Sequence, residues 1–187
     1  MRVRRFLGIS TIWTLAALVG CAAHTPSVTQ DEKPTGQEAY LYGRFYVDAK
    51  GGKLALDGHQ TMGFVIKCAS GETYTFRSSN DSPLQVIKNA PSVCSLTEFV
   101  QTSADGQVRS RTRAPEKLMR DVKFDAGKAY YLGDFYAEAS TMPAGKSASS
   151  VWSIKTVRND YTSTSAALKA AYPNLAKVPT ENRMIGR

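Results

Sequence analysis

Residues 39–49 read Ala-Tyr-Leu-Tyr-Gly-Arg-Phe-Tyr-Val-Asp-Ala, and residues 129–139 read Ala-Tyr-Tyr-Leu-Gly-Asp-Phe-Tyr-Ala-Glu-Ala. The two stretches align without gaps, and six of the eleven aligned pairs are identical. Aromatic residues in such a pattern are typical of β-strands, in which successive side chains point to opposite faces. We therefore expect a strand in each stretch. The likeness fades outside them, so it does not indicate a duplicated domain.

Alternation assigns the side chains of both strands to two faces. Glycine and phenylalanine fall on one face, which we expect to be core. The other face carries the tyrosines Tyr40, Tyr42, Tyr46, Tyr130 and Tyr136. This tyrosine face is either a solvent-exposed binding surface or a surface covered by a C-terminal helix, and cover is favoured because a row of large aromatic rings gains from burial.

One aligned position carries opposite charges, with Arg44 matching Asp134. If the strands are antiparallel neighbours in one sheet, these two residues can lie on the same outer face and form an ion pair. In the alternative, each strand borders a similar core in a different sheet, and the two residues do not meet.

The chain beyond Glu38 continues in alternating apolar segments separated by glycine, aspartate and serine, a pattern typical of a sandwich or small barrel. The predicted strands are Tyr40–Ala49, Thr61–Cys68, Thr73–Arg77, Leu84–Lys88, Val93–Thr102, Gln107–Arg113, Leu118–Phe124, Lys128–Glu138 and Val151–Arg158. One helix is expected over Thr164–Tyr172, ended by Pro173. The predicted fold is all-β, an antiparallel β-sandwich (immunoglobulin-like or related) with one short C-terminal helix, over residues 38–187.

The composition is that of an ordinary globular protein. Of 187 residues, 42% are hydrophobic and 21% charged, which excludes a disordered chain, a collagen-like fibre and a polytopic membrane protein. The net charge of +8 includes Arg2, Arg4 and Arg5; without them 21 basic residues face 16 acidic ones. The remaining +5 is too small to indicate a nucleic-acid partner.

The N-terminus has the pattern of an export signal. Three arginines precede an uncharged apolar run, Phe6–Val19, that ends in Leu18-Val19-Gly20-Cys21. This ending resembles the lipobox of bacterial lipoproteins. The resemblance implies that residues 1–20 are removed, that Cys21 is acylated and becomes the N-terminus, and that Ala22 and Ala23 permit transfer to the outer membrane. The alternative is an ordinary signal peptide with a chance cysteine. Residues 21–37, rich in Thr, Pro and Gln, are expected to form a flexible tether.

The two remaining cysteines are predicted to form a disulfide. Cys68 falls at an inward position of its strand, and Cys94 lies between Val93 and Leu96. An exported protein folds in an oxidising compartment, where such a pair persists as a disulfide. The alternative is two separate buried thiols.

The strand pattern, the segment Phe124–Phe135 and the late Tyr172-Pro173 together resemble an uncharacterised β-sandwich domain of proteobacterial lipoproteins. The similarity covers about Tyr40 to Val178. Such domains carry no established catalytic residues, so the resemblance implies only fold and location.

Residues with catalytic or metal-binding chemistry are sparse. His24 and His59 have no Cys or His at ligand spacing, so neither a metal site nor a cofactor is predicted. The motifs G-x-S-x-G, G-x-G-x-x-G and the P-loop do not occur. Arg109, Arg111 and Arg113 share one predicted strand face. They either meet an anionic lipid, glycan or acidic protein, or protect an edge strand from aggregation, and the second is favoured.

We therefore expect a lipid-anchored, non-catalytic lipoprotein at the periplasmic face of the outer membrane. Its partners would be the membrane, through the anchor, and an envelope protein or glycan, but not nucleic acid. The alternative is a periplasmic hydrolase or cell-wall-modifying enzyme.

Overall fold

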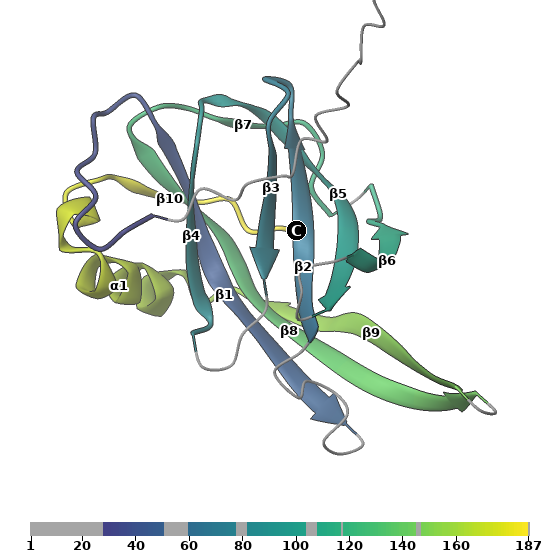
Figure 1. The fold of residues 1–187 in the computed structure, drawn as a ribbon. Coiled ribbons are helices and arrows are strands. Elements are labelled where there is room, and N and C mark those ends of the chain that lie inside the picture. Colours follow the sequence, from purple (N-terminus) through teal and green to yellow (C-terminus); the bar gives the residue numbers. More distant parts are fainter. Residues whose placement is uncertain are drawn as a thin grey trace, which may run out of the picture.

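The computed structural model describes residues 28–50, 60–77, 82–103, 108–116, 118–144 and 147–186 (Figure 1). In chain order the elements are β1 (Ala39–Lys50), β2 (Gln60–Cys68), β3 (Thr73–Arg77), β4 (Leu84–Asn89), β5 (Ser92–Ser103), β6 (Val108–Arg113), β7 (Val122–Phe124), β8 (Lys128–Ala144), β9 (Ser147–Arg158), α1 (Tyr161–Ala171), a 3-10 helix (Pro173–Leu175) and β10 (Thr180–Asn182). The predicted all-β sandwich with a short C-terminal helix is confirmed.

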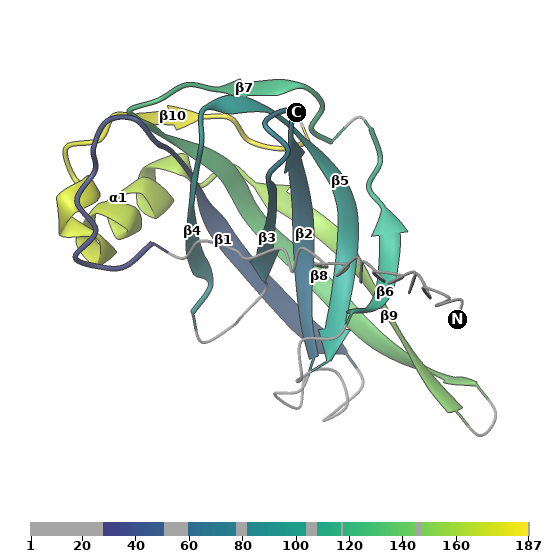
Figure 2. The same ribbon diagram turned by 45° about the horizontal axis from the view of Figure 1, so that its top comes forward.

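Two sheets make up the sandwich. The first has the order β10-β8-β1-β4, and β9 pairs with the outer part of β8. The second has the order β3-β2-β5-β6, and β7 pairs with β5. The first sheet is mixed, because β8 runs parallel to both β1 and β10. The view in Figure 2 shows α1 on the outer side of this first sheet, next to β1 and β4.

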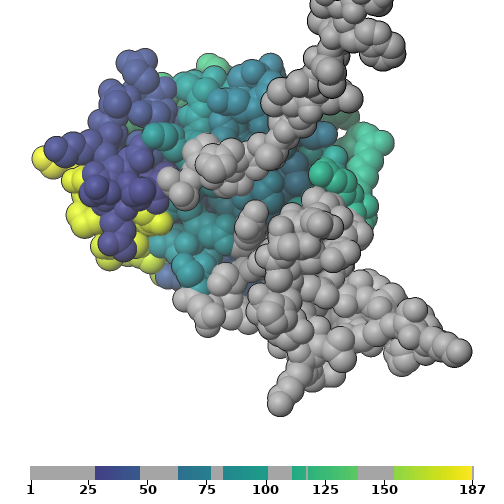
Figure 3. Space-filling view, viewed as in Figure 1, coloured from purple at the N-terminus to yellow at the C-terminus, as the bar shows by residue number. Residues whose placement is uncertain are grey.

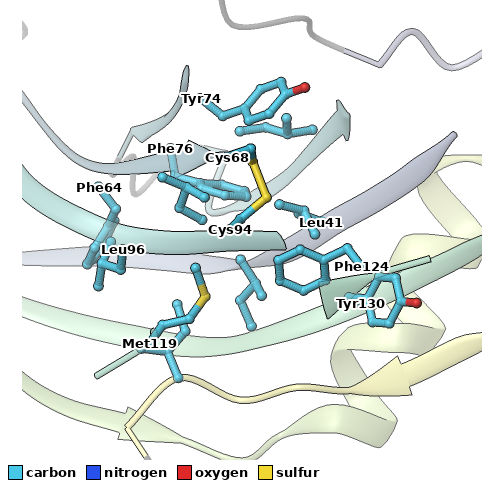
Figure 4. Close-up of a cluster of buried hydrophobic side chains, with 14 of the residues drawn as sticks. Leu41, Phe64, Cys68, Tyr74, Phe76, Cys94, Leu96, Met119, Phe124 and Tyr130 are labelled. Carbon is cyan, nitrogen blue, oxygen red and sulfur yellow. A yellow bond between two sulfur atoms is a disulfide. The ribbon is translucent and has the colours of Figure 1, made fainter. Parts of the chain in front are cut away.

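The main core lies between the sheets and is rich in phenylalanine. The ring of Phe45 lies 4.7 to 5.1 Å, centroid to centroid, from the rings of Phe64, Phe76 and Phe135. Figure 4 shows another part of this cluster, where Leu41, Phe124 and Tyr130 pack near the Cys68–Cys94 disulfide. The predicted disulfide is therefore confirmed, and it joins paired positions of β2 and β5.

A second apolar cluster lies on the outer face of the first sheet. Tyr40, Tyr42 and Tyr131 project from the sheet there, and Leu168 of α1 packs on them without any exposed surface. On the helix side of the sheet, Tyr40 and Tyr42 of the predicted tyrosine face are therefore covered, whereas Tyr46 and Tyr136 remain partly exposed. Val28 joins the same cluster and is 7% exposed.

Part of the expected tether packs against the sandwich. The Asn174 side chain donates a hydrogen bond to the Asp31 carbonyl, and Lys88 pairs with Glu32. Figure 3 shows this N-terminal segment, in purple, beside the yellow C-terminal residues. Residues 28–37 are therefore not a free tether, because Val28 and these polar contacts hold them to the sheet and helix. Residues 1–27 lie outside the described residues.

A bulge in β8 overturns one face assignment. Leu41 pairs with Tyr130, but Arg44 pairs with Asp134, so β8 has one extra residue between these positions. Gly133 has a φ of +126°, a conformation that disfavours residues with a Cβ. The bulge reverses the alternation of side chains, and Tyr130 therefore points into the core on the face opposite Tyr136. The prediction of one shared tyrosine face was wrong for Tyr130.

Three further expectations were corrected. The strand predicted over Leu118–Phe124 is limited to Val122–Phe124, since Leu118 and Met119 belong to a loop in which the Met119 carbonyl accepts a hydrogen bond from Leu96. The helix begins at Tyr161 rather than Thr164, because the Thr164 N–H already bonds the Asp160 carbonyl. The twin strands are parallel neighbours, not antiparallel ones.

Candidate functional site

Three of the proposed surface tyrosines are buried and unavailable to a partner. Tyr40 and Tyr42 are at most 1% exposed beneath α1, and the Tyr42 hydroxyl lies 2.6 Å from the Ser165 hydroxyl. Burial raises the pKa of Tyr42 to about 12. Tyr130 lies in the main core, where its hydroxyl accepts a 2.8 Å hydrogen bond from the Asp125 N–H. Only Tyr46 and Tyr136 remain partly exposed.

Tyr46 and Tyr136 form a stacked pair beyond the helix-covered part of the sheet. Their ring centroids are 4.8 Å apart and their planes differ by 15°. Arg158 adds a third planar group, with its guanidinium carbon 4.6 Å from the centroid of Tyr136. These three side chains come from β1, β8 and β9, which are neighbours in one sheet. We call Tyr46, Tyr136 and Arg158 the aromatic ladder.

A buried carboxylate lies next to the ladder. Asp134 is fully buried; the Thr164 hydroxyl lies 2.9 Å from both carboxylate oxygens, and the Tyr131 hydroxyl donates to Oδ1 over 3.0 Å. Arg44 approaches from the surface side, with Nη1 3.8 Å from Oδ2. Burial raises the pKa of the Asp134 carboxyl above its usual value, against the opposing effect of these hydrogen bonds. Because the carboxyl is sealed from solvent, it positions α1 and Arg44 rather than reacting with a substrate.

The Tyr131 hydroxyl links this carboxylate to the start of α1. It accepts a hydrogen bond from the Asp160 N–H over 3.0 Å and lies 3.0 Å from the Arg158 carbonyl oxygen. The end of β9 and the first turn of the helix are therefore tied to the same point of β8. This network holds the backbone of Arg158, and with it the last member of the ladder.

The arginines of β6 are paired with acidic residues. Arg111 bonds Glu98 over 2.6 Å, and Arg113 bonds Glu116 over 2.7 Å. Arg109 falls at a register shift between β5 and β6, so the backbone alternation that was expected to align it with the other two is interrupted. Its side chain lies outside the described residues. Arg111 and Arg113 are therefore both paired with carboxylates, in a strand that lies at the edge of its sheet.

Sequence reasoning missed Thr164 and Arg158, for which no local pattern marks a role. Asp134 had one usable signal, its charge opposite that of Arg44 in the aligned strands. Cys21, His24 and His59 all lie outside the described residues. In the described parts of the chain, no group of three or more His, Cys, Asp or Glu could hold a metal ion. No helix of those parts is long and apolar enough to cross a membrane.

Comparison with known proteins identified little. No family model matches the chain, and no curated protein matches it. Among solved structures, the chain is similar to the crystal structure of a "putative cell adhesion protein" from Bacteroides uniformis ATCC 8492. The identity is 10% and the TM-score 0.24, over 64% of this chain and 50% of the other. The chain thus spans half the length of that protein, and a likeness of this size carries no argument about function.

Proposed function

We propose that this chain is an exported, lipid-anchored protein of the cell envelope that binds an envelope protein or glycan and catalyses no reaction. The observation that carries the proposal is the buried disulfide between Cys68 and Cys94. It accounts for both cysteines of the sandwich and is the form such a pair takes in an oxidising compartment. Cys21, at the end of the lipobox-like segment, is the cysteine that remains for acylation.

The surface proposed to meet the partner is the aromatic ladder. Tyrosine and arginine are the side chains that most often dominate binding energy at interfaces, and both can hydrogen-bond the hydroxyls of a glycan. Stacking fixes the three planar groups before binding, so little side-chain entropy remains to be lost. Arg44, 25% exposed and held by Asp134, adds a positive charge beside them.

Acylation tests the anchor. The wild-type chain should incorporate a fatty-acid analogue in cells and partition with membranes, whereas Cys21→Ser should lose both properties. Ala23→Ser, a matched substitution in the same segment, should retain them. Equal labelling of the Cys21→Ser chain would overturn the anchor.

Photo-crosslinking tests the surface. A photoreactive residue replacing Arg158 should yield an adduct with an envelope protein or glycan in intact cells. The same residue replacing Lys169, which is exposed on α1, is the matched control and should yield none. Adducts of equal yield at both positions would argue against the ladder as the contact surface.

A further inference from the structure

A cleft opens on the side of the sandwich where β6 and β9 lie. At the opposite side the sheets are joined, since the Tyr74 hydroxyl of β3 accepts a hydrogen bond from the Ala90 N–H that follows β4. Figures 1 and 2 both show β6 and β9 on the side away from α1. Between them lies a cleft of about 540 Å³. This volume falls within the usual range of small-molecule sites, roughly 300 to 1,000 Å³.

The walls of the cleft are mainly apolar and continue the main core. Phe99 comes from the second sheet, Ile154 and Val157 come from the first, and all three are only partly buried. One end is closed by the C-terminal segment, which is held by hydrogen bonds from Ile185 N–H to the Leu132 carbonyl and from Gly186 N–H to the Leu118 carbonyl. A ligand in the cleft would therefore cover apolar surface that the two sheets leave open.

The charges on the cleft are all of one sign. Among the described residues that line it, the charged ones are Arg113 on the β6 rim and Lys155 on the β9 rim. Each has a carboxylate partner, Glu116 at 2.7 Å and Glu138 at 3.1 Å, that does not line the cleft. Arginine has five N–H donors and lysine three, so both can bind a further anion. An apolar cavity with a cationic rim is complementary to an amphiphile with an anionic head.

The strands at the rim do not suit an added peptide strand. In β9 the register with β8 shifts at Lys155, and in β6 the register with β5 shifts at Arg109. Such bulges and edge charges interrupt the regular backbone hydrogen bonding that strand addition requires. A hydrocarbon chain needs no backbone partner, so these interruptions do not oppose it.

We propose that this cleft binds one long-chain fatty acid, with its hydrocarbon tail on the apolar walls and its carboxylate at the rim formed by Arg113 and Lys155. This ligand site is separate from the aromatic ladder and does not depend on acylation of Cys21. The site would let the protein hold or carry a free fatty acid in an aqueous compartment.

The binding experiment uses the full chain carrying Cys21→Ser, so that the protein's own acyl groups are absent. Delipidated protein should bind cis-parinaric acid with one saturable site per chain, and palmitate should displace it. Val157→Trp places a larger side chain in the cleft and leaves less apolar wall for the hydrocarbon tail. It should therefore weaken binding about tenfold or more. Val93→Trp is the matched control at an exposed position outside the cleft and should bind normally.

A second variant tests the head group and leaves the core untouched. Arg113→Gln/Lys155→Gln should weaken palmitate severalfold but leave hexadecanol unchanged, because only palmitate carries the anion. Lys123→Gln/Lys169→Gln removes the same charge from exposed side chains that do not line the cleft and should bind palmitate normally.

Three results would overturn the proposal. The first is palmitate binding that neither the Val157→Trp nor the rim variant weakens, since the ligand would then lie elsewhere. The second is displacement of the probe by a short peptide of alternating valine and threonine as strongly as by palmitate, which would make the cleft a strand acceptor. The third is binding to phosphatidylglycerol vesicles that Val157→Trp abolishes while palmitate does not bind. The labelling of Cys21 is a separate readout and decides only the anchor.

Discussion

Arg44 and Asp134 are paired across the parallel strands β1 and β8, with Nη1 of the arginine 3.8 Å from Oδ2 of the aspartate. The aspartate side chain is 1% exposed and the arginine side chain 25%. The pair therefore runs from the solvent into a buried network that includes Thr164 of α1. It connects the surface beside the aromatic ladder to the helix that covers the sheet.

The pH dependence of stability should reveal the buried carboxyl. Burial raises the pKa of Asp134 in the folded state above its ordinary value of 3.8. A carboxyl whose pKa is higher in the folded state binds more protons when folded. The free energy of unfolding therefore falls as the pH rises from the pKa of the unfolded state through that of the folded state. Asp134→Asn removes this loss. Urea unfolding should show wild type losing stability relative to Asp134→Asn above about pH 4; parallel curves would contradict the raised pKa.

Double-mutant cycles should rank the partners of Asp134. The Thr164 hydroxyl lies within hydrogen-bond distance of both carboxylate oxygens in a buried site, so Asp134→Asn with Thr164→Val should give a coupling of about 1 to 3 kcal/mol. The Arg44 contact is longer and partly exposed, so Arg44→Gln with Asp134→Asn should give less than about 1 kcal/mol. Chemical unfolding of each variant measures both couplings. A larger coupling for Arg44 would reverse the order of the two contacts.

Sequence patterns located the twin strands and the disulfide because each rests on local alternation. Cys68 was placed inward by parity, and the structure pairs it with Cys94. Parity failed at Tyr130, since the bulge at Gly133 adds one residue and later side chains change face. The sequence did not predict that bulge, because Gly43 occupies the aligned position of β1 and β1 has no extra residue there.

The direction of pairing and the contacts between distant segments were beyond local patterns. Alternation is the same in parallel and antiparallel strands, so the parallel β1–β8 pair could not be inferred from it. The three-residue β10 is too short to show a period. The ladder and the cleft both combine residues from strands far apart in sequence, and only the three-dimensional arrangement brings them together.

Gly43 should be intolerant of any side chain. A Cβ at this position would lie 2.5 Å from the carbonyl oxygen of Gly133 in the neighbouring strand. Gly43→Ala therefore forces β1 and β8 apart and should cost about 3 kcal/mol of unfolding free energy. Gly71→Ala is the control: φ is +91° there and no atom lies within 4 Å, so backbone strain alone should cost about 1 kcal/mol. Equal losses in thermal or urea unfolding would show that the close approach is unimportant.

Reduction of the disulfide should destabilise the sandwich, although both cysteine side chains stay in the core. The disulfide closes a loop with a sequence separation of 26, for which the chain-entropy relation gives roughly 3 to 4 kcal/mol. Urea unfolding of wild type with and without dithiothreitol measures the difference. The Cys68→Ala/Cys94→Ala variant should be insensitive to the reductant. A similar response in that variant would mean that dithiothreitol acts on something other than the bond.

Truncation of Leu168 should loosen the packing of α1 on the tyrosines beneath it. Leu168 has no exposed surface and belongs to the same apolar cluster as Tyr40, Tyr42 and Tyr131, which Tyr161 of α1 also contacts. Leu168→Ala leaves a cavity there and should cost about 2 to 5 kcal/mol, whereas Lys169→Ala, on the exposed side of the same helix, should cost less than about 0.5 kcal/mol. Hydrogen exchange should then rise first at α1 and only later in β1 and β8, because the main core holds these strands from the other face. Simultaneous exchange of helix and strands would instead show that the two apolar clusters unfold as one unit.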